Sequence, residues 1–139
     1  MAKMIFVNLP VADVAKSTAF YEALGFERNA QFSNEQGASM VWSESISFML
    51  LDRAFFATFT TKPVGDAHAS SNVLIALSYD SRAEVDAITD AAIAAGGKEA
   101  HDPEDMGFMY SRAFWDLDGH GFGPVWMDMA AMPATPEAA

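Results

Sequence analysis

Short apolar stretches and helical segments alternate along the chain in an order that occurs twice. Each half begins with an apolar run, residues 4–9 and then 73–77, which predicts a strand. Each run is followed by a residue suited to a helix N-cap, Asp13 or Ser81, and by apolar positions three and four residues apart. The pattern therefore predicts a strand and a capped helix at the start of each half, and both helices are expected to end at a glycine, Gly25 or Gly96.

Three strand-like stretches follow each of these helices. They are residues 26–32, 38–42 and 46–51 in the first half, and 98–101, 108–115 and 122–127 in the second. The order is βαβββ, linker, βαβββ, and the economical interpretation is an internal duplication. We expect one domain over residues 1–129: module one at 4–52, a linker at 53–71, module two at 72–128, then a mobile tail at 130–139.

The predicted fold is α+β, with the two modules forming a curved mixed sheet around a cleft. Each module alone would leave one sheet half covered, so the two sheets are expected to curve toward each other. Two local features refine this picture. Asp116-Leu117-Asp118-Gly119 has the composition of a tight turn, in which the aspartates bond backbone amides. Gly123-Pro124 favours an edge or bulged position for the last strand.

Charge excludes several classes of partner. The chain has 139 residues, 8 of them Lys or Arg and 19 Asp or Glu, which gives a net charge of −11. Binding to nucleic acid depends on Lys and Arg contacts to phosphate, so a nucleic-acid partner is not expected, and an anionic membrane surface is equally unsuited. Eleven of the acids but only three of the bases lie in residues 80–128. A solvated acidic face explains this imbalance, and attraction for a cationic ligand is the alternative.

Cysteine is absent, so disulfides, thiolate metal sites and a cysteine nucleophile are excluded. Its absence is compatible with a reducing cytoplasm, where we expect the protein to act. No stretch approaches the roughly 18 apolar residues that a membrane helix needs. The 11 Phe, 9 Met and 3 Trp are many for a small acidic domain and call for an explanation.

Motifs at both ends of the duplicated region resemble one superfamily. Asn8-Leu9-Pro10-Val11-Ala12-Asp13, continuing to Phe20-Tyr21 and Leu24-Gly25-Phe26, resembles the opening signature of the vicinal oxygen chelate superfamily. Phe114-Trp115-Asp116-Leu117-Asp118-Gly119-His120 resembles its closing signature. That superfamily contains glyoxalase I, extradiol dioxygenases and the fosfomycin and bleomycin resistance proteins, and the chain is most similar to its bacterial glyoxalase-like subgroup.

The resemblance implies a divalent metal in the cleft, held by His, Glu or Gln. The corresponding positions in this chain carry Phe6, Met49 or Leu50, Leu74 and Gly123. None of these side chains is a ligand for a hard or borderline divalent cation. We therefore expect no metal cofactor and no catalytic residue at the usual place. Apolar side chains at these positions would account for part of the large number of aromatic residues and methionines.

The expected cleft supplies the candidate ligand-binding residues. Phe6 and Asn8 share one strand face, and Asn8 would be either a polar anchor or a buried amide satisfied by the backbone. Arg112 would hold a ligand anion or, as the favoured alternative, pair with local acids. The candidate walls, some of which ordinary core packing would explain, are Trp42, Phe48, Leu50, Tyr110 and Trp126.

Two functions compete. The first is a metal-free, bleomycin-resistance-like protein that binds a small apolar or aromatic molecule, with a cationic ligand favoured by the acidic second half. The second is a metal-dependent lyase or dioxygenase of the glyoxalase type with displaced ligands, such as His101 and His120 with Asp102, Asp116 or Asp118. No ligand spacing supports this set, and His68 and His120 are expected at the surface. The family further implies a homodimer.

Overall fold

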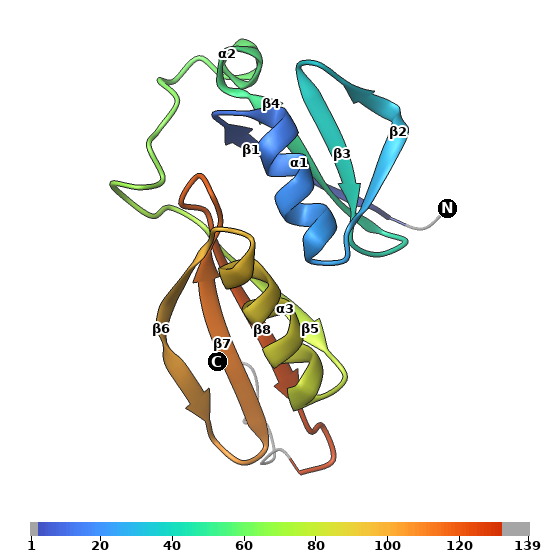
Figure 1. The fold of residues 1–139 in the computed structure, drawn as a ribbon, viewed down its shortest axis with the longest axis vertical. Helices are drawn as coiled ribbons and strands as arrows, with labels where there is room; N and C mark the ends of the chain where they lie inside the picture. The colour runs from blue at the N-terminus through green and yellow to red at the C-terminus, as the bar shows by residue number, and fades with distance from the viewer. Residues whose placement is uncertain (1–2, 132–139) are drawn as a thin grey trace.

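Two modules of the same construction make up the computed structural model, which describes residues 3–131 (Figure 1). Most of the tail expected at 130–139 lies outside the described residues. Module one contains β1 (Ile5–Val11), α1 (Val14–Ala23), β2 (Glu27–Asn34), β3 (Gly37–Val41) and β4 (Ile46–Asp52). Module two contains β5 (Leu74–Tyr79), α3 (Arg82–Ala94), β6 (Lys98–Asp105), β7 (Met109–Trp115) and β8 (Gly121–Met127). Between them lie α2 (Arg53–Phe56) and the short helix η1 (Ala57–Phe59).

The two sheets have matching strand orders, β1-β4-β3-β2 and β5-β8-β7-β6. In each sheet the first strand pairs in parallel with the last, and the other pairs are antiparallel. This confirms the predicted α+β fold of two βαβββ modules. No helix among residues 3–131 is long and apolar enough to cross a membrane.

The predicted helix ends are confirmed by their caps. The Asp13 side chain accepts a hydrogen bond from the Lys16 amide at 3.0 Å, and the Ser81 hydroxyl accepts one from the Glu84 amide at 3.1 Å. Beyond the helices, Gly25 and Gly96 have φ values of +99° and +109°. A side chain with Cβ would be strained at such angles, which explains why glycine stands at both positions.

A single core joins the two modules. Helices α1 and α3 lie in front of their sheets in Figure 1, and the side chains between helices and sheets meet in the middle. Tyr21 on α1 packs edge-to-face on Phe122 of β8, with ring centroids 5.9 Å apart, and Phe48 of β4 lies 5.7 Å from the same ring. The modules therefore pack through their helix-covered sides.

Two local predictions are corrected. Asp102-Pro103-Glu104-Asp105, expected as a turn, belongs to strand β6, which tolerates Pro103 because it is an edge strand with irregular pairing. Strand β8 is central in its sheet. Its pairing with β7 is interrupted between the pairs Ser111–Val125 and Phe114–Phe122. Pro124 lies in this interval, so its missing backbone N–H does not remove a hydrogen bond between paired residues of the two strands.

Candidate functional site

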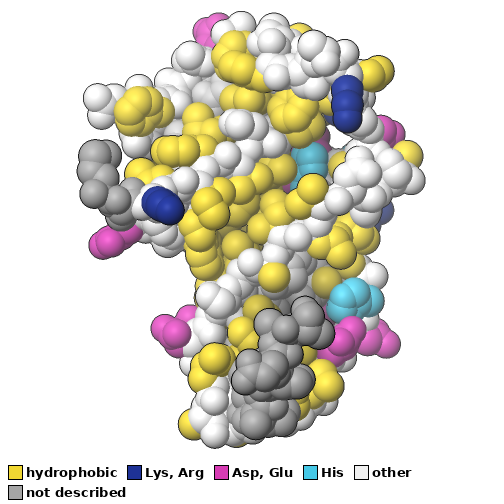
Figure 2. Space-filling view, turned by 180° about the vertical axis from the view of Figure 1, so that it is seen from behind, with side chains coloured by type: hydrophobic (Ala, Val, Ile, Leu, Met, Phe, Trp, Pro, Cys, Tyr) yellow, Lys and Arg dark blue, Asp and Glu magenta, His cyan; other side chains and the backbone are white. Residues whose placement is uncertain are grey.

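Each sheet has one face covered by its helix and one face that we call the open face. Figure 2, seen from behind the helices of Figure 1, shows hydrophobic side chains gathered over the centre of this surface. On β1 the side chains alternate between the two faces: Leu9 and Val11 are buried in the core, whereas Phe6 is 55% exposed. On β5, Leu77 is buried and Leu74 is 72% exposed. Large apolar side chains thus point away from the core in both modules.

The open face of module two is hollowed into a cavity of about 530 Å³. Cross-strand pairs place its residues together, since Met109 pairs with Met127 and Ser111 with Val125. The main apolar side chains along it are Leu74, Met109, Trp115, Val125 and Met127. This volume is within the range of small-molecule sites, and such sites are lined mainly by apolar groups with a few polar ones.

Gly121 forms the floor at one end of this cavity. A Cβ built there would lie 2.7 Å from the indole of Trp115 and 2.8 Å from Cδ2 of Leu74. Only glycine leaves room for both side chains to close over the backbone. The glycine therefore allows an aromatic and an aliphatic side chain to meet across the sheet.

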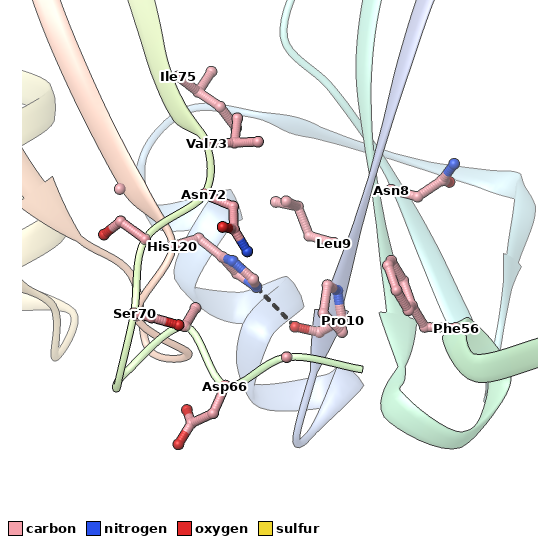
Figure 3. A pocket seen from close by; sticks show the side chains of 15 residues that line it. Asn8, Leu9, Pro10, Phe56, Asp66, Ser70, Asn72, Val73, Ile75 and His120 are labelled. Atoms are coloured by element: carbon pink, nitrogen blue, oxygen red, sulfur yellow. Dashed lines mark hydrogen bonds between the residues drawn. The ribbon is translucent and has the colours of Figure 1, made fainter. Parts of the chain in front are cut away.

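The open face of module one carries two of the predicted ligand-binding residues. Phe6 and Asn8 lie on β1, where they pair with Ser47 and Met49 of β4. Asn8 is exposed and also contributes to a smaller cavity of about 230 Å³ beside the linker (Figure 3). In that cavity Nε2 of His120 lies 2.8 Å from the carbonyl oxygen of Pro10, a contact that joins the two modules.

The other predicted wall residues lie on the helix-covered side. Phe48 and Leu50 have no exposed surface and belong to the core, which corrects their placement in a cleft. Trp42 donates from Nε1 to the Tyr79 hydroxyl at 3.2 Å and so bridges the modules. Strands were predicted at both places, β3 and β4, but an apolar strand pattern alone does not say which face the helix covers.

Tyr110, Arg112 and Trp126 share that same side. The Arg112 guanidinium contacts the carboxylates of Asp86, Asp90 and Glu99 at 2.8–3.1 Å, and its side chain is only 10% exposed. These acids hold the pKa of Arg112 above its usual value, against the effect of burial. Arg112 is therefore engaged by local acids, the alternative that its sequence context favoured. Tyr110 and Trp126 pack under the guanidinium of Arg82 at 5.3 and 5.0 Å.

The four positions where the family resemblance implies metal ligands are now placed. Phe6, Met49, Leu74 and Gly123 lie on the open faces, and the pairing of Asn8 with Met49 shows that Met49 rather than Leu50 occupies the equivalent position in module one. No side chain in this set is a carboxylate or an imidazole, so the donor chemistry does not fit a divalent metal. Residues 3–131 contain no group of three or more His, Asp or Glu side chains positioned to hold a metal ion.

The turn between β7 and β8 has a structural role. Asp116, 4% exposed, accepts hydrogen bonds at Oδ1 from the amides of Asp118 and His120, as the turn composition predicted. Its Oδ2 accepts from the Tyr21 hydroxyl at 2.5 Å. Burial, and then the charge of Asp116, raise the pKa of Tyr21 well above its usual value, so the phenol remains a donor. This contact fastens α1 to module two.

Comparison with known proteins agrees with the family resemblance. Residues 3–41 match the family described as bleomycin resistance protein-like N-terminal. Comparison with curated protein sequences gives no match.

Solved structures share the fold over nearly the whole chain. A hypothetical protein, SA1046 from S. aureus, is 27% identical, with a TM-score of 0.77 over 91% of this chain and 95% of that one. A glyoxalase/bleomycin resistance protein/dioxygenase family enzyme from Burkholderia phytofirmans PsJN is 19% identical, with a TM-score of 0.73 over 91% and 99%. TnmS3 from Streptomyces sp. CB03234, described as an antibiotic binding protein, is 23% identical, with a TM-score of 0.62 over 91% and 97%.

Proposed function

We propose that this chain, which resembles the vicinal oxygen chelate superfamily and has the glyoxalase/bleomycin resistance fold, is a metal-free protein that binds a small apolar or aromatic molecule. The observation that carries the proposal is the open face of module two, a cavity of about 530 Å³ with apolar walls. The antibiotic-binding description of TnmS3 supports the same class of function for this fold. Met109 and Met127 suit a site that adapts its shape to a flat ligand.

Binding of a neutral aromatic probe tests this proposal. N-phenylnaphthylamine, titrated into the purified protein, is expected to gain fluorescence as it leaves water. Met127→Glu places a charge in the cavity at a 38% exposed position, and it should weaken binding at least about ten-fold. Phe59→Glu, at a 69% exposed position on η1, is the matched control and should leave binding unchanged. Equal binding by both variants would exclude the cavity as the site.

Metal analysis separates this proposal from the metal-dependent alternative. The donor-poor open faces support a metal content below about a tenth of an equivalent in protein purified without chelator. One equivalent of Zn, Ni, Mn or Fe per chain, together with turnover of the hemithioacetal of methylglyoxal and glutathione, would favour a lyase instead. Mutation of His101 or His120 would then show whether displaced ligands hold the metal.

The proposal includes a homodimer, in which a second copy covers the open faces. On these faces, Phe6 of β1 is 55% exposed and Leu74 of β5 is 72% exposed. Obligate dimers bury surfaces of this kind.

Sedimentation tests the dimer separately from binding. Two chains of 15.0 kDa give about 30 kDa, and we expect that species at micromolar concentration. Phe6→Asp should shift the sedimentation toward 15 kDa, because it places a carboxylate in the covered surface. A wild-type protein that sediments at 15.0 kDa would refute the dimer and leave the binding proposal intact.

A further inference from the structure

We propose that Glu104 and His101, both on β6, form the polar end of the module-two cavity and select ligands whose apolar body carries a cationic, hydrogen-bond-donating end group. This inference rests on the proposed binding function and specifies the ligand class. Both residues line the cavity of about 530 Å³ described above. Neither residue stands at a position where the family resemblance implies a ligand-binding residue.

The pairing of β6 places both side chains on the cavity side: a first irregularity moves His101 there, and a second keeps Glu104 on the same face. Glu99 pairs with Phe114 of β7, and His101 pairs with Ala113, so one extra residue lies in β6 between the two pairs. In a regular strand Glu99 and His101 would share a face. The shift leaves Glu99 on the helix-covered side, where its carboxylate forms an ion pair with Arg112. It places His101 on the open face beside Ala113.

The second irregularity offsets the first, so that Glu104 stays on the open face together with His101. His101 pairs with Ala113 and Glu104 with Ser111, so three steps along β6 match two along β7. Residues three apart in a regular strand point to opposite sides, but Ala113 and Ser111 share a face and their partners therefore share it too. The extra residue falls at Asp102-Pro103, where a proline is compatible with a break in pairing. Bulges re-aim side chains in this manner beside binding sites.

The polar end presents acceptors rather than donors. Nδ1 of His101 lies 2.8 Å from the carbonyl oxygen of Asp102, and because a carbonyl only accepts, Nδ1 carries the hydrogen. In this tautomer Nε2 carries no hydrogen and is an acceptor. Glu104 is exposed, and its carboxylate makes no hydrogen bond or ion pair within residues 3–131. Two acceptors, one of them charged, call for a ligand group that donates, such as an ammonium or amidinium.

The charges near the cavity support a cation at this end. Arg112 is the only Lys or Arg among the cavity residues, and its guanidinium is occupied by three carboxylates on the opposite side of the sheet. Lys98, at the other end of β6, contributes to a different cavity beside the linker. The three acids Asp86, Asp90 and Glu99 lie with Arg112 on the helix-covered side. The attraction for a cation therefore comes from Glu104 and not from the net charge of the module.

Three probes with the same ring system test the inference. They are anthracenylmethylamine, which is cationic, anthracenemethanol, which is neutral, and anthraceneacetate, which is anionic. Dissociation constants come from fluorescence anisotropy with the full chain. We expect the amine to bind about two- to five-fold more tightly than the alcohol, and the acetate to bind least tightly. Glu104→Gln should abolish the preference for the amine, and its exposed position keeps the fold unaffected.

Asp102→Asn is the matched control. It removes the same charge from the same strand, but Asp102 does not line the cavity. The amine preference should persist in this variant. Equal affinity of the three probes for the wild-type protein, or equal loss of the preference in both variants, would overturn the inference while the binding function stands. Binding of none of the probes would overturn the proposed binding function and this inference with it.

Discussion

Removal of one hydroxyl tests how the two modules are held together. Tyr21→Phe deletes the donor to Asp116 Oδ2 and keeps the ring, which packs edge-to-face on Phe20 and Phe26 at centroid distances of 5.2 and 5.3 Å. Tyr21 is fully buried and Asp116 is 4% exposed. The substitution therefore leaves a buried carboxylate oxygen without its side-chain partner, and water has little access to replace it.

The expected loss follows from this geometry. A hydrogen bond to a charged group contributes about 1.5–3 kcal/mol to stability. For the buried bond between Tyr21 and Asp116 we expect a loss of about 2 kcal/mol. For 139 residues the entropy of unfolding is about 0.29 kcal/mol/K, so a loss of about 2 kcal/mol lowers Tm by about 7 °C. Thermal and urea unfolding, followed by circular dichroism at equal protein concentrations, measure both quantities.

Tyr110→Phe is the control for this experiment. The Tyr110 hydroxyl also donates to a carboxylate, that of Asp86 at 2.7 Å, but the Asp86 side chain is 46% exposed. Water replaces the lost donor there, so the expected loss is below about 0.5 kcal/mol. Equal losses in the two variants would show that burial does not set the strength of the Tyr21 contact, and the reasoning would be refuted.

Three further substitutions probe charge and backbone strain. Burial, opposed by the amide of Ala12, raises the pKa of Asp118, so the fold disfavours its ionised form. Asp118→Asn should therefore stabilise the protein by up to about 1 kcal/mol at neutral pH. This advantage should fade as the pH falls below the ordinary aspartate pKa of 3.8, because the folded and unfolded chains then both bind the proton; urea unfolding at neutral pH and at about pH 3 checks this. Arg112→Met leaves three carboxylates uncompensated, and its destabilisation in urea unfolding should shrink when about 0.5 M NaCl is added. Gly119→Ala should cost about 2 kcal/mol or more in the same assay, because φ is +89° and the new Cβ would lie 2.7 Å from the backbone of Ala67.

The fold could be predicted from the sequence because its signals are local and occur twice. Asp13 and Ser81 are caps, Gly25 and Gly96 end helices, and the closing turn needs Asp116 to bond its own backbone amides; each of these follows from a few neighbouring residues. Strand β6 was the exception. Its extra residues are recognised only against the pairing partner on β7, so the sequence between 98 and 105 suggested a short strand and a turn.

The site was predicted less well, because alternation identifies two faces and does not say which one the helix covers. Phe48 and Leu50 are as apolar as Phe6 and Leu74, yet the first two are fully buried in the core and the other two are exposed. Trp115, which closes one end of the cavity, belongs to the closing signature and is not among the predicted wall residues. Alternation places Trp115 on the face opposite its neighbour Phe114, but only the structure shows that Phe114 is the buried one of the two.

The acidic second half shows why the distribution of charge matters more than its sum. Eleven acids in residues 80–128 suggested attraction for a cation, but Asp86, Asp90 and Glu99 surround Arg112 on the helix-covered side, with the sheet between them and the cavity. Their field at the cavity is weakened by the ion pairs and by solvent. Glu104, which lines the cavity on the open face, therefore changes ligand preference more than the remaining net charge does. If the preference for the cationic probe persists in Glu104→Gln and fades with added salt, the net charge has the larger effect and Glu104 the smaller one.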